Sequence, residues 1–319
     1  VEGAFAQTYE PLEIILSDDC SPDRTYAIMQ EMAAGYTGPH KVVLNRNEPN
    51  LGLVPHIDRV MELVSGGFIV VNAGDDVSVP ERAEKLVDIW LSSRQKIKLV
   101  HSATTRIDET GRALRRREPN PKMQQDIEPA EIIIGRLCVI GATAGWTRDV
   151  FSSFGPLGAN LSNEDHVIPF RAAILGHLVY TPKALVKHRE GGITARERKG
   201  LGYDYLYGLS HKVRNWDSLV DLHILKNSDL YNYPQKTTTE AVCRARAPIM
   251  RFAVNLAEAS HLRRWAMAPK AARLAWQHQK FTPLKDWARY TFEPLYLKYI
   301  DWRASQHSAV SATIKEFKE

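Results

Sequence analysis

Short apolar segments alternate with helix-like segments through the first hundred residues, and this alternation restricts the fold more than any other feature. The apolar runs are Leu12–Leu16, Lys41–Leu44, Phe68–Val71 and Lys98–Ser102. Segments with helical spacing or helix-start residues lie between them, at Pro22–Ala34, Val54–Val64 and Ser78–Trp90. The alternation predicts an α/β fold with a mostly parallel sheet that is flanked by helices.

Local signals predict where two of these helices begin. Ser21 is placed as an N-cap with Pro22 at the first helical position. Ser78 and Glu81 have the spacing of a capping box. Farther along the chain, Leu178–Tyr180 and Ala184–Val186 are predicted as two short strands.

Two acidic pairs directly follow apolar strands. Asp18 and Asp19 end the first run, and Asp75 and Asp76 follow the third. Ligands of an open parallel sheet bind outside the carboxyl ends of its strands. Clustered carboxylates at that edge favour a Mg²⁺ or Mn²⁺ ion that holds a diphosphate. The alternative is that these residues only form turns and caps, although two pairs at equivalent positions make that reading weaker.

A third acidic segment precedes a helical stretch at Val167–Leu175. Its residues are Asn163, Glu164, Asp165 and His166. Taken alone, these residues could simply cap the helix and stabilise its dipole, without any role in a site.

Six segments, taken in order, resemble the inverting family 2 glycosyltransferases of the GT-A fold. The resemblance extends over roughly Val1 to Thr194. The segments are Gln7–Thr25, Asn50–Gly52, Asn72–Arg82, Gly141–Gly155, Asn163–Gly176 and Leu185–Thr194.

The resemblance implies a role for each matching residue. Asp19, with Asp18 beside it, would bind the nucleotide base, and Asn50 belongs to the same nucleotide-sugar site. Asp76 would bind Mn²⁺ or Mg²⁺ directly, with Asp75 at the ribose or beside the metal. Asp165 would be the general base, oriented by Glu164. The remaining residues would contact the acceptor or the diphosphate: His166, His188 and Arg189.

Two departures from the family pattern are present. The leading carboxylate of the usual Asp-x-Asp-Asp motif is replaced by Ala73. The first apolar strand of the family, expected about 20 residues before Gln7, is missing. We therefore expect this chain to be an N-terminal truncation that binds nucleotide poorly, whereas the full-length protein would have the activity.

The C-terminal third differs in charge and composition. Residues 201–319 contain 18 Lys and Arg against 11 Asp and Glu, whereas the first 200 residues have a small acidic excess. Five of the seven tryptophans lie in this region. We predict a GT-A domain at 1–200 and a basic, helical extension at 201–319. Its helices are expected at Thr238–Met267, Pro269–Phe281 and Pro283–Ser305.

Trp265, Trp276 and Trp287 leave two interpretations of this extension open. It could lie on an anionic membrane surface, where a lipid-linked acceptor would reside. It could equally pack on the catalytic domain or on a second subunit, because tryptophans also anchor ordinary cores.

The expected function is a metal-dependent hexosyl transfer from a UDP-, GDP- or dTDP-linked sugar to a glycan or lipid-linked acceptor, in bacterial surface polysaccharide synthesis. The alternative is a catalytically degenerate glycan- or lipid-binding module of the same fold. Nucleic acid is not an expected partner, because no nucleic-acid-binding motif is present. Three widely spaced cysteines and the lack of a long apolar stretch favour a cytoplasmic protein. If the C-terminal extension binds lipid, the protein would be peripheral on the inner face of the cytoplasmic membrane.

Overall fold

The structure is a computed structural model that describes residues 1–116, 127–133, 139–158, 161, 164–189, 233–299 and 302, without the side chains of 115 and 116. These residues divide into two compact units, one from Val1 to Arg189 with 233–239, the other from Glu240 onward. The expected boundary at residue 200 lies outside the described residues. In the described part, no helix is both long and apolar enough to cross a bilayer.

A small parallel sheet contains the first two predicted strands. β1 (Glu13–Asp18) pairs with β2 (Lys41–Arg46), and Asp18 lies opposite Arg46. Side chains along β1 alternate between half-buried and buried, as expected for a strand with one face on a core.

A second sheet has six strands. Its order is β3 (Phe68–Val70), β7 (Ala144–Thr147), β5 (Ile97–Ile107), β8 (His177–Arg189) and β4 (Val77–Ser78), and β6 (Ala113–Arg116) also pairs with β5. Only the β5–β8 pair is parallel here. The α/β class is confirmed, but the sheet is mixed and not mostly parallel, because β7, β4 and β6 enter it antiparallel.

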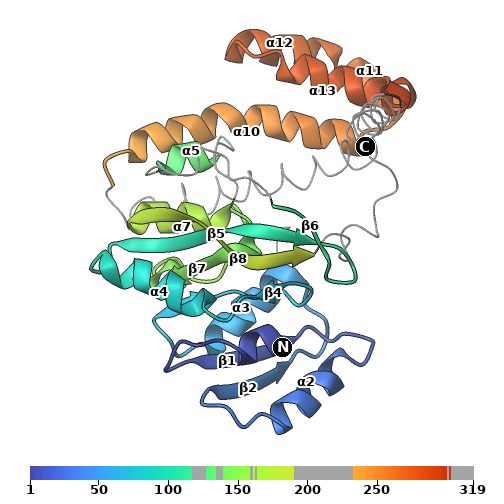
Figure 1. Ribbon diagram of the computed structural model, residues 1–319. Coiled ribbons are helices and arrows are strands. Elements are labelled where there is room, and N and C mark those ends of the chain that lie inside the picture. The colour runs from blue at the N-terminus through green and yellow to red at the C-terminus, as the bar shows by residue number, and fades with distance from the viewer. Residues whose placement is uncertain are drawn as a thin grey trace, which may run out of the picture. The chain divides into compact units, whose positions relative to one another are not determined.

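Helices lie on both sides of this sheet (Figure 1). In that view α7 (Val167–Leu175) lies above β5 and α4 (Arg82–Ser92) lies below it. Leu86 of α4 packs with Ile97 and Val100 of β5 in a buried cluster. The remaining elements of this unit are α1 (Glu2–Phe5), α2 (Thr25–Ala34), α3 (Leu53–Leu63), α5 (Pro129–Ile133), the 3-10 turn η2 (Gly141–Thr143) and α6 (Asp149–Ser152).

Two helices begin later than predicted, because the predicted cap residues have other partners. The Ser21 N–H donates to Asp18 Oδ2 at 3.0 Å, so α2 begins only at Thr25, with N-cap Arg24. Ser78 belongs to β4, and its hydroxyl bonds to Asn72 and Arg82. Helix α4 therefore begins at Arg82, and both cap predictions were wrong.

The two short strands predicted near residue 180 form one long strand, β8. Ser102 of β5 lies opposite Thr181, and Ala103 lies opposite Ala184. Pro182 and Lys183 thus form a bulge that needs no ladder hydrogen bond from the proline. Pro182 is thus accommodated within the strand.

The second unit is helical, as predicted. It contains α10 (Lys236–Glu258), whose first four residues are assigned to the other unit, α11 (His261–Ala266), α12 (Ala268–His278) and α13 (Thr282–Thr291). Residues 293–299 are also helical. The single helix expected at Thr238–Met267 is interrupted after Glu258. Phe252, Leu256, Ala271, Leu274 and Tyr290 form the core of this unit.

Candidate active site

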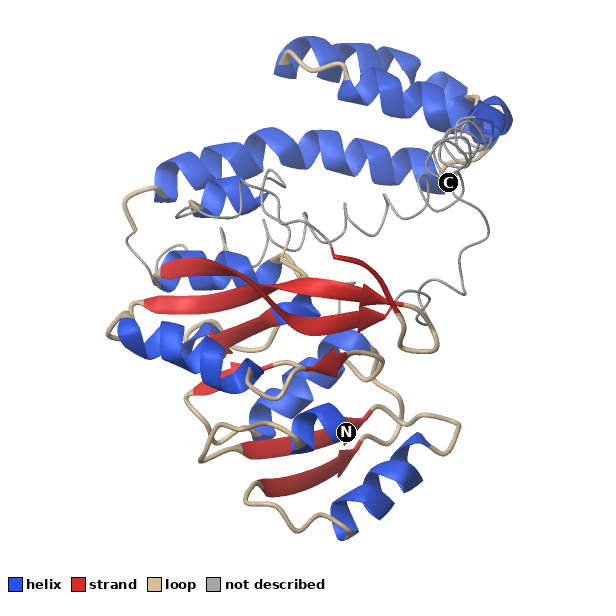
Figure 2. Ribbon diagram, viewed as in Figure 1, coloured by secondary structure: helices blue, strands red, loops and turns tan. Residues whose placement is uncertain are grey.

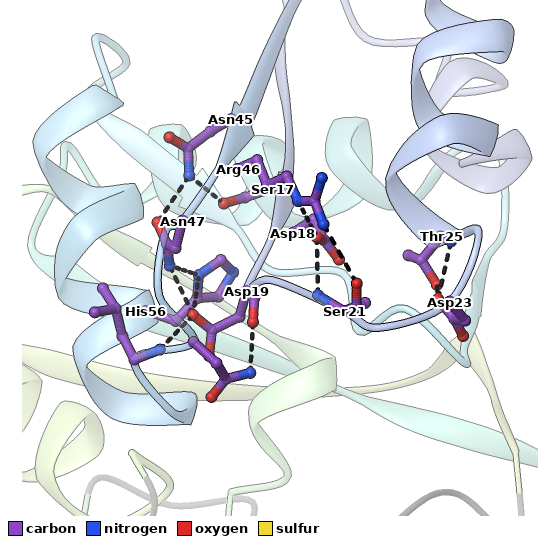
Figure 3. Close-up of polar contacts among 12 residues, drawn as sticks. Ser17, Asp18, Asp19, Ser21, Asp23, Thr25, Asn45, Arg46, Asn47 and His56 are labelled. Carbon is purple, nitrogen blue, oxygen red and sulfur yellow. Dashed lines mark hydrogen bonds and ion pairs between the residues drawn. The ribbon is translucent and has the colours of Figure 1, made fainter.

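The loop after β1 is organised around the carboxylate of Asp19 (Figure 3). Its Oδ1 accepts hydrogen bonds from Asn47 Nδ2 at 2.8 Å and from the Leu51 N–H at 2.9 Å. Its Oδ2 accepts from the Gly52 N–H at 2.8 Å. These bonds stabilise the ionised form and lower the pKa of Asp19, against the opposing effect of burial.

Residues 50–52 form a turn fitted to this carboxylate. Gly52 has a φ of +83°, which a residue with a side chain rarely adopts. The Asn50 side chain donates to the carbonyl oxygen of Asp19 and accepts from the Gly52 N–H. The structure therefore brings Asn50 and Asp19 together.

Asp18 has a different environment. Its side chain is buried, and its Oδ2 lies 3.0 Å from the Ser21 nitrogen and 3.5 Å from Arg46 Nε. A buried carboxylate with these partners fixes the loop between β1 and α2 and does not face solvent.

A second acidic cluster joins the loop after β3 to the end of β8. Asp76 Oδ2 lies 2.9 Å from His188 Nδ1, and Asp76 Oδ1 accepts the Arg189 N–H at 2.8 Å. The hydrogen bond to Asp76 raises the pKa of His188, which favours an imidazolium facing the carboxylate. The Arg189 guanidinium donates to the carbonyl oxygens of Asp75, Asp108 and Glu109. Both Asp76 oxygens thus have protein partners.

The exposed carboxylate of this cluster belongs to Asp75. No group of three His, Cys, Asp or Glu side chains that could enclose a metal occurs in the described part of the chain. One free carboxylate fits an ion that takes most of its ligands from a diphosphate and water, as Mg²⁺ commonly does. The described residues therefore fit a metal ion bound jointly by Asp75, a diphosphate and water, and not an ion bound by protein side chains alone.

Arg82 connects the acidic cluster to the segment before β7. Its guanidinium is fully buried, and it donates to Ser78 Oγ at 2.8 Å and to the Ala142 carbonyl oxygen at 2.7 Å. Burial lowers the pKa of Arg82 to about 10, and the negative charge of Asp76 opposes this effect. Arg82 remains charged at neutral pH and links β4 to Gly141–Thr143.

Glu164 and Asp165 form a carboxyl pair beside Gly141. The Gly141 N–H donates to Asp165 Oδ1 at 2.8 Å. A Cβ atom on Gly141 would lie 2.4 Å from Glu164 Oε1 and 2.6 Å from Asp165 Oδ1. The two carboxyl oxygens are consequently no more than about 5 Å apart, and only glycine leaves room for both.

The pair has raised pKa values. Burial, followed by the negative charge of Glu164, raises the pKa of Asp165 to about 7, against the Gly141 hydrogen bond that lowers it. Burial also raises the pKa of Glu164. When one of two neighbouring carboxyls is ionised, its charge opposes ionisation of the other. A carboxylate that ionises near pH 7 is suited to accept a proton there.

A small cavity lies beside this pair. Its lining includes Gly141, Trp146, Glu164 and Asp165, together with Leu99, Val139, Ala144, Ile168 and Pro169. Glu164 Oε2 and Trp146 Nε1 are enclosed, and neither has a hydrogen-bond partner within the described part of the protein. Unpaired enclosed polar atoms are uncommon and indicate a place for a water or hydroxyl group.

The predicted residues therefore lie in three groups: Asp18, Asp19 and Asn50; Asp75, Asp76, His188 and Arg189; and Glu164 and Asp165, with His166 at the N-cap of α7. Strands β1, β2, β5 and β8 all point the same way in Figure 2. The ends of β1 and β8, which precede Asp19 and contain Arg189, thus lie on one side of the unit.

Sequence reasoning did not assign Arg82, Gly141, Asn47 or His56 to the site. Asn47 Nδ2 lies 2.6 Å from His56 Nδ1, next to Asp19. Arg82 and Gly141 lay inside segments already singled out, so their position was visible but their contacts were not. Asn47 directly follows β2 and could have been noticed, since loops after parallel strands meet at one edge.

Comparison with known sequences gives a family match. Residues 1–155 match the sequence model for glycosyl transferase family 2. The chain is 32% identical to glycosyltransferase EpsE of Bacillus subtilis over 111 residues, which span 35% of this chain and 39% of EpsE. It is 26% identical to the amylovoran biosynthesis glycosyltransferase AmsE of Erwinia amylovora over 206 residues, 64% of this chain and 74% of AmsE.

Comparison with solved structures identifies the fold. The Staphylococcus aureus protein TarS aligns with a TM-score of 0.56 at 12% identity, over 92% of this chain and 50% of TarS. The mannosyltransferase PcManGT of Pyrobaculum calidifontis aligns with a TM-score of 0.54 at 16% identity, over 93% of this chain and 79% of PcManGT. The GT-A fold is confirmed.

Proposed function

Because residues 1–155 belong to glycosyl transferase family 2, we propose that this chain transfers a sugar from a nucleotide-diphosphate donor to an acceptor hydroxyl with inversion at the anomeric carbon. The observation that best supports this is the enclosed Glu164–Asp165 pair beside Gly141. Burial and the charge of Glu164 raise the pKa of Asp165 in this pair to about 7. The proposal treats this pair as the proton acceptor of the transfer reaction.

Asp165 is the general base. In an inverting transfer, the acceptor hydroxyl attacks the anomeric carbon from the face opposite the diphosphate, and its proton leaves as the new bond forms. Asp165 Oδ1 is fixed by the Gly141 N–H, so the free Oδ2 is the oxygen that receives the proton. Glu164 raises the basicity of Asp165, because its charge opposes ionisation of the neighbour.

Asp75 and Asp76 serve the donor diphosphate in different ways. Asp75 has the exposed carboxylate and is the direct ligand of a divalent cation, which revises the expectation that Asp76 takes this role. Asp76 uses both oxygens to hold His188 and the backbone of Arg189, and so positions these two residues toward the diphosphate. When bound, Mn²⁺ or Mg²⁺ neutralises the charge that develops on the leaving diphosphate.

The nucleotide is assigned to the Asp19 loop. Oδ2 of Asp19 has one described donor, the Gly52 N–H, and can accept a second hydrogen bond from a base. Solved relatives of this fold bind UDP-GlcNAc in TarS and GDP-Man with Mn²⁺ in PcManGT. We therefore expect a UDP-, GDP- or dTDP-linked sugar as the donor.

The acceptor is a glycan or lipid-linked hydroxyl in polysaccharide synthesis at the cytoplasmic face of the membrane. The name of one relative, the amylovoran biosynthesis glycosyltransferase AmsE, supports a role in polysaccharide synthesis. A neutral hydroxyl of this kind can pair with the enclosed Glu164 Oε2 or Trp146 Nε1.

A glycan-binding module without catalysis is the second candidate. Ala73 replaces the leading carboxylate of the family motif, and the protein itself occupies both oxygens of Asp76. Such a module would bind donor or acceptor without transferring a proton, so the raised pKa of Asp165 would have no role in it.

The test is nucleotide release from a panel of UDP-, GDP- and dTDP-sugars with Mn²⁺ and a mixture of glycan and lipid-linked acceptors. Three variants accompany the wild type: Asp165→Asn, Asp75→Ala and, as a matched control, Asp88→Ala on the exposed surface of α4. Donor binding is measured in parallel by calorimetry with and without Mn²⁺.

The expected result is nucleotide release from one donor, and chelation of the metal should abolish it. In Asp165→Asn the rate of release should fall at least a hundredfold, while donor affinity stays at the wild-type value. Asp75→Ala is expected to lose donor affinity as well as release. Donor binding without release in the wild type would favour the binding module. Release that survives in Asp165→Asn would contradict the assignment of the base.

A further inference from the structure

The second unit exposes aromatic side chains that its own core does not use. Fourteen large apolar residues are exposed in the described part of the chain, and eight of them lie between Leu262 and Trp302. All six exposed aromatic residues are in this group: Trp265, Trp276, Phe281, Phe292, Tyr299 and Trp302. Contiguous exposed apolar groups on a soluble unit commonly mark an interaction surface.

The three equally spaced tryptophans have different roles. Trp287 packs against the core of the unit, and its indole N–H donates to the carbonyl oxygen of Arg264 at 2.8 Å. Trp265 contacts Trp287 with ring centroids 6.0 Å apart. Trp276, by contrast, is 79% exposed. Trp287 thus belongs to the core, Trp265 leans on it, and Trp276 is the most exposed of the three.

Trp276 and Phe281 project from a well-defined turn between α12 and α13. The N–H of Gln279 donates to the Trp276 carbonyl oxygen, and the N–H of Lys280 donates to that of Ala275. Phe281, which is 75% exposed, immediately precedes α13. We call Trp276, Lys280 and Phe281 the hairpin tip. Its backbone is fixed by hydrogen bonds, so little conformational entropy is lost when the two rings are buried by a partner.

The described residues from 261 to 299 have an unbalanced positive charge. Six exposed cations lie on α11–α13 and the adjoining residues: Arg263, Lys270, Arg273, Lys280, Lys285 and Lys298. The two acidic residues between positions 261 and 299 have partners of opposite charge, Asp286 with Arg289 at 3.2 Å and Glu293 with Arg264 at 2.8 Å. No acidic side chain in this stretch is available to neutralise the six cations.

We propose that the hairpin tip inserts into the interface of an anionic phospholipid bilayer, to which the excess positive charge of the surrounding unit attracts it. Projecting aromatic rings beside Lys and Arg are suited to the headgroup region, where rings lie among acyl chains and cations among phosphates. Single-stranded nucleic acid would also attract cations, but its bases stack on rings along a charged groove. The projecting tip therefore favours the bilayer.

The proposal deepens the proposed function by naming the surface at which a lipid-linked acceptor would be met. It depends on that function only for the identity of the acceptor. Vesicle binding can be measured with no donor or acceptor present, so the failure of one proposal can be told apart from the failure of the other.

The test is co-sedimentation of the full chain with vesicles of phosphatidylcholine alone or mixed with phosphatidylglycerol. Strong binding is expected only to the mixed vesicles, and it should weaken as salt shortens the Debye length. Trp276→Ala/Phe281→Ala should lower the partition coefficient by about tenfold or more, since burial of one aromatic side chain corresponds to at least that factor. Lys280→Gln should lower it by about fivefold on the mixed vesicles.

The matched control is Ile28→Ala/Leu91→Ala, which removes two exposed apolar side chains from the first unit. It should leave vesicle binding at wild type, and all three variants should unfold at the wild-type temperature. Equal binding of Trp276→Ala/Phe281→Ala and the control would overturn the proposal. So would equal binding to the two vesicle types, or displacement of the protein from mixed vesicles by a single-stranded oligonucleotide at low concentration.

Discussion

Replacing Asp165 with asparagine is expected to stabilise the protein more at pH 8 than at pH 5, because the wild type loses stability between these pH values and the variant does not. Burial and the charge of Glu164 raise the pKa of Asp165 to about 7 in the folded state, whereas an aspartate in an unfolded chain has a pKa of about 3.9. Between these values the folded state holds a proton that the unfolded state has released. Stability therefore falls as the pH rises toward 7.

The size of the effect follows from the shift. Each pKa unit corresponds to about 1.4 kcal/mol, so the rise from pH 5 to pH 8 removes about 2–3 kcal/mol of wild-type stability through this one group. Asparagine has the shape of the protonated acid, and its side-chain oxygen can still accept the Gly141 N–H. The variant therefore keeps the contacts of the pH 5 state at both pH values, without the cost of ionisation.

The assay is urea denaturation at pH 5 and pH 8, followed by circular dichroism. Asp165→Ala is the control. It leaves a gap in the packing and should be less stable than Asp165→Asn at both pH values. Its stability should depend on pH as weakly as that of Asp165→Asn. An Asp165→Asn variant whose stability falls between pH 5 and pH 8 by as much as the wild type would refute the reasoning.

Three further changes test the scaffold of the site. Gly141→Ala should lower transfer at least tenfold with little change in donor affinity, because its Cβ would lie under 3 Å from oxygens of both Glu164 and Asp165; activity assays and calorimetry separate the two effects. Arg82→Ala should lower the free energy of unfolding by about 2–4 kcal/mol, measured in urea, because buried hydrogen-bond partners lose their donor. Gly52→Ala should cost about 1–2 kcal/mol through its positive φ and weaken donor binding.

Controls for these changes are available in the same unit. Gly66→Ala meets only a carbonyl oxygen at 3.7 Å, an ordinary contact, so it should leave transfer at wild type. Wild-type activity in Gly141→Ala would show that the carboxyl pair can move without loss. A stability loss below about 1 kcal/mol in Arg82→Ala would mean that water replaces its hydrogen bonds.

The positions of the acidic residues could be predicted, because they depend on local sequence. A carboxylate directly after an apolar strand is placed at the strand's carboxyl end whatever the rest of the chain does. Asp19 and Asp76 were found in this way. Which of two adjacent aspartates is exposed could not be predicted, since Asp76 is buried by β8, more than a hundred residues away in sequence.

The antiparallel members of the sheet were also beyond local reasoning. Strand β7 is only four residues long and fully buried, so its sequence has no polar–apolar alternation that would identify it as a strand, and its direction is set by its neighbours. β8 was predicted as two short strands, Leu178–Tyr180 and Ala184–Val186, although Pro182 lies within one continuous strand. The bulge that accommodates this proline depends on the register with β5, which is a property of the pair and not of either strand.

The three acidic groups share one structural principle, which bears on how the site can change. Asp19 accepts main-chain N–H groups of Leu51 and Gly52, Asp76 accepts that of Arg189, and Asp165 accepts that of Gly141. Each carboxylate is thus fixed by the backbone of a segment remote in sequence. Backbone donors do not depend on side-chain identity, so residues around them can vary without moving the carboxylates. Substitutions that change the path of the backbone, at Gly52 or Gly141, are the ones this arrangement does not tolerate.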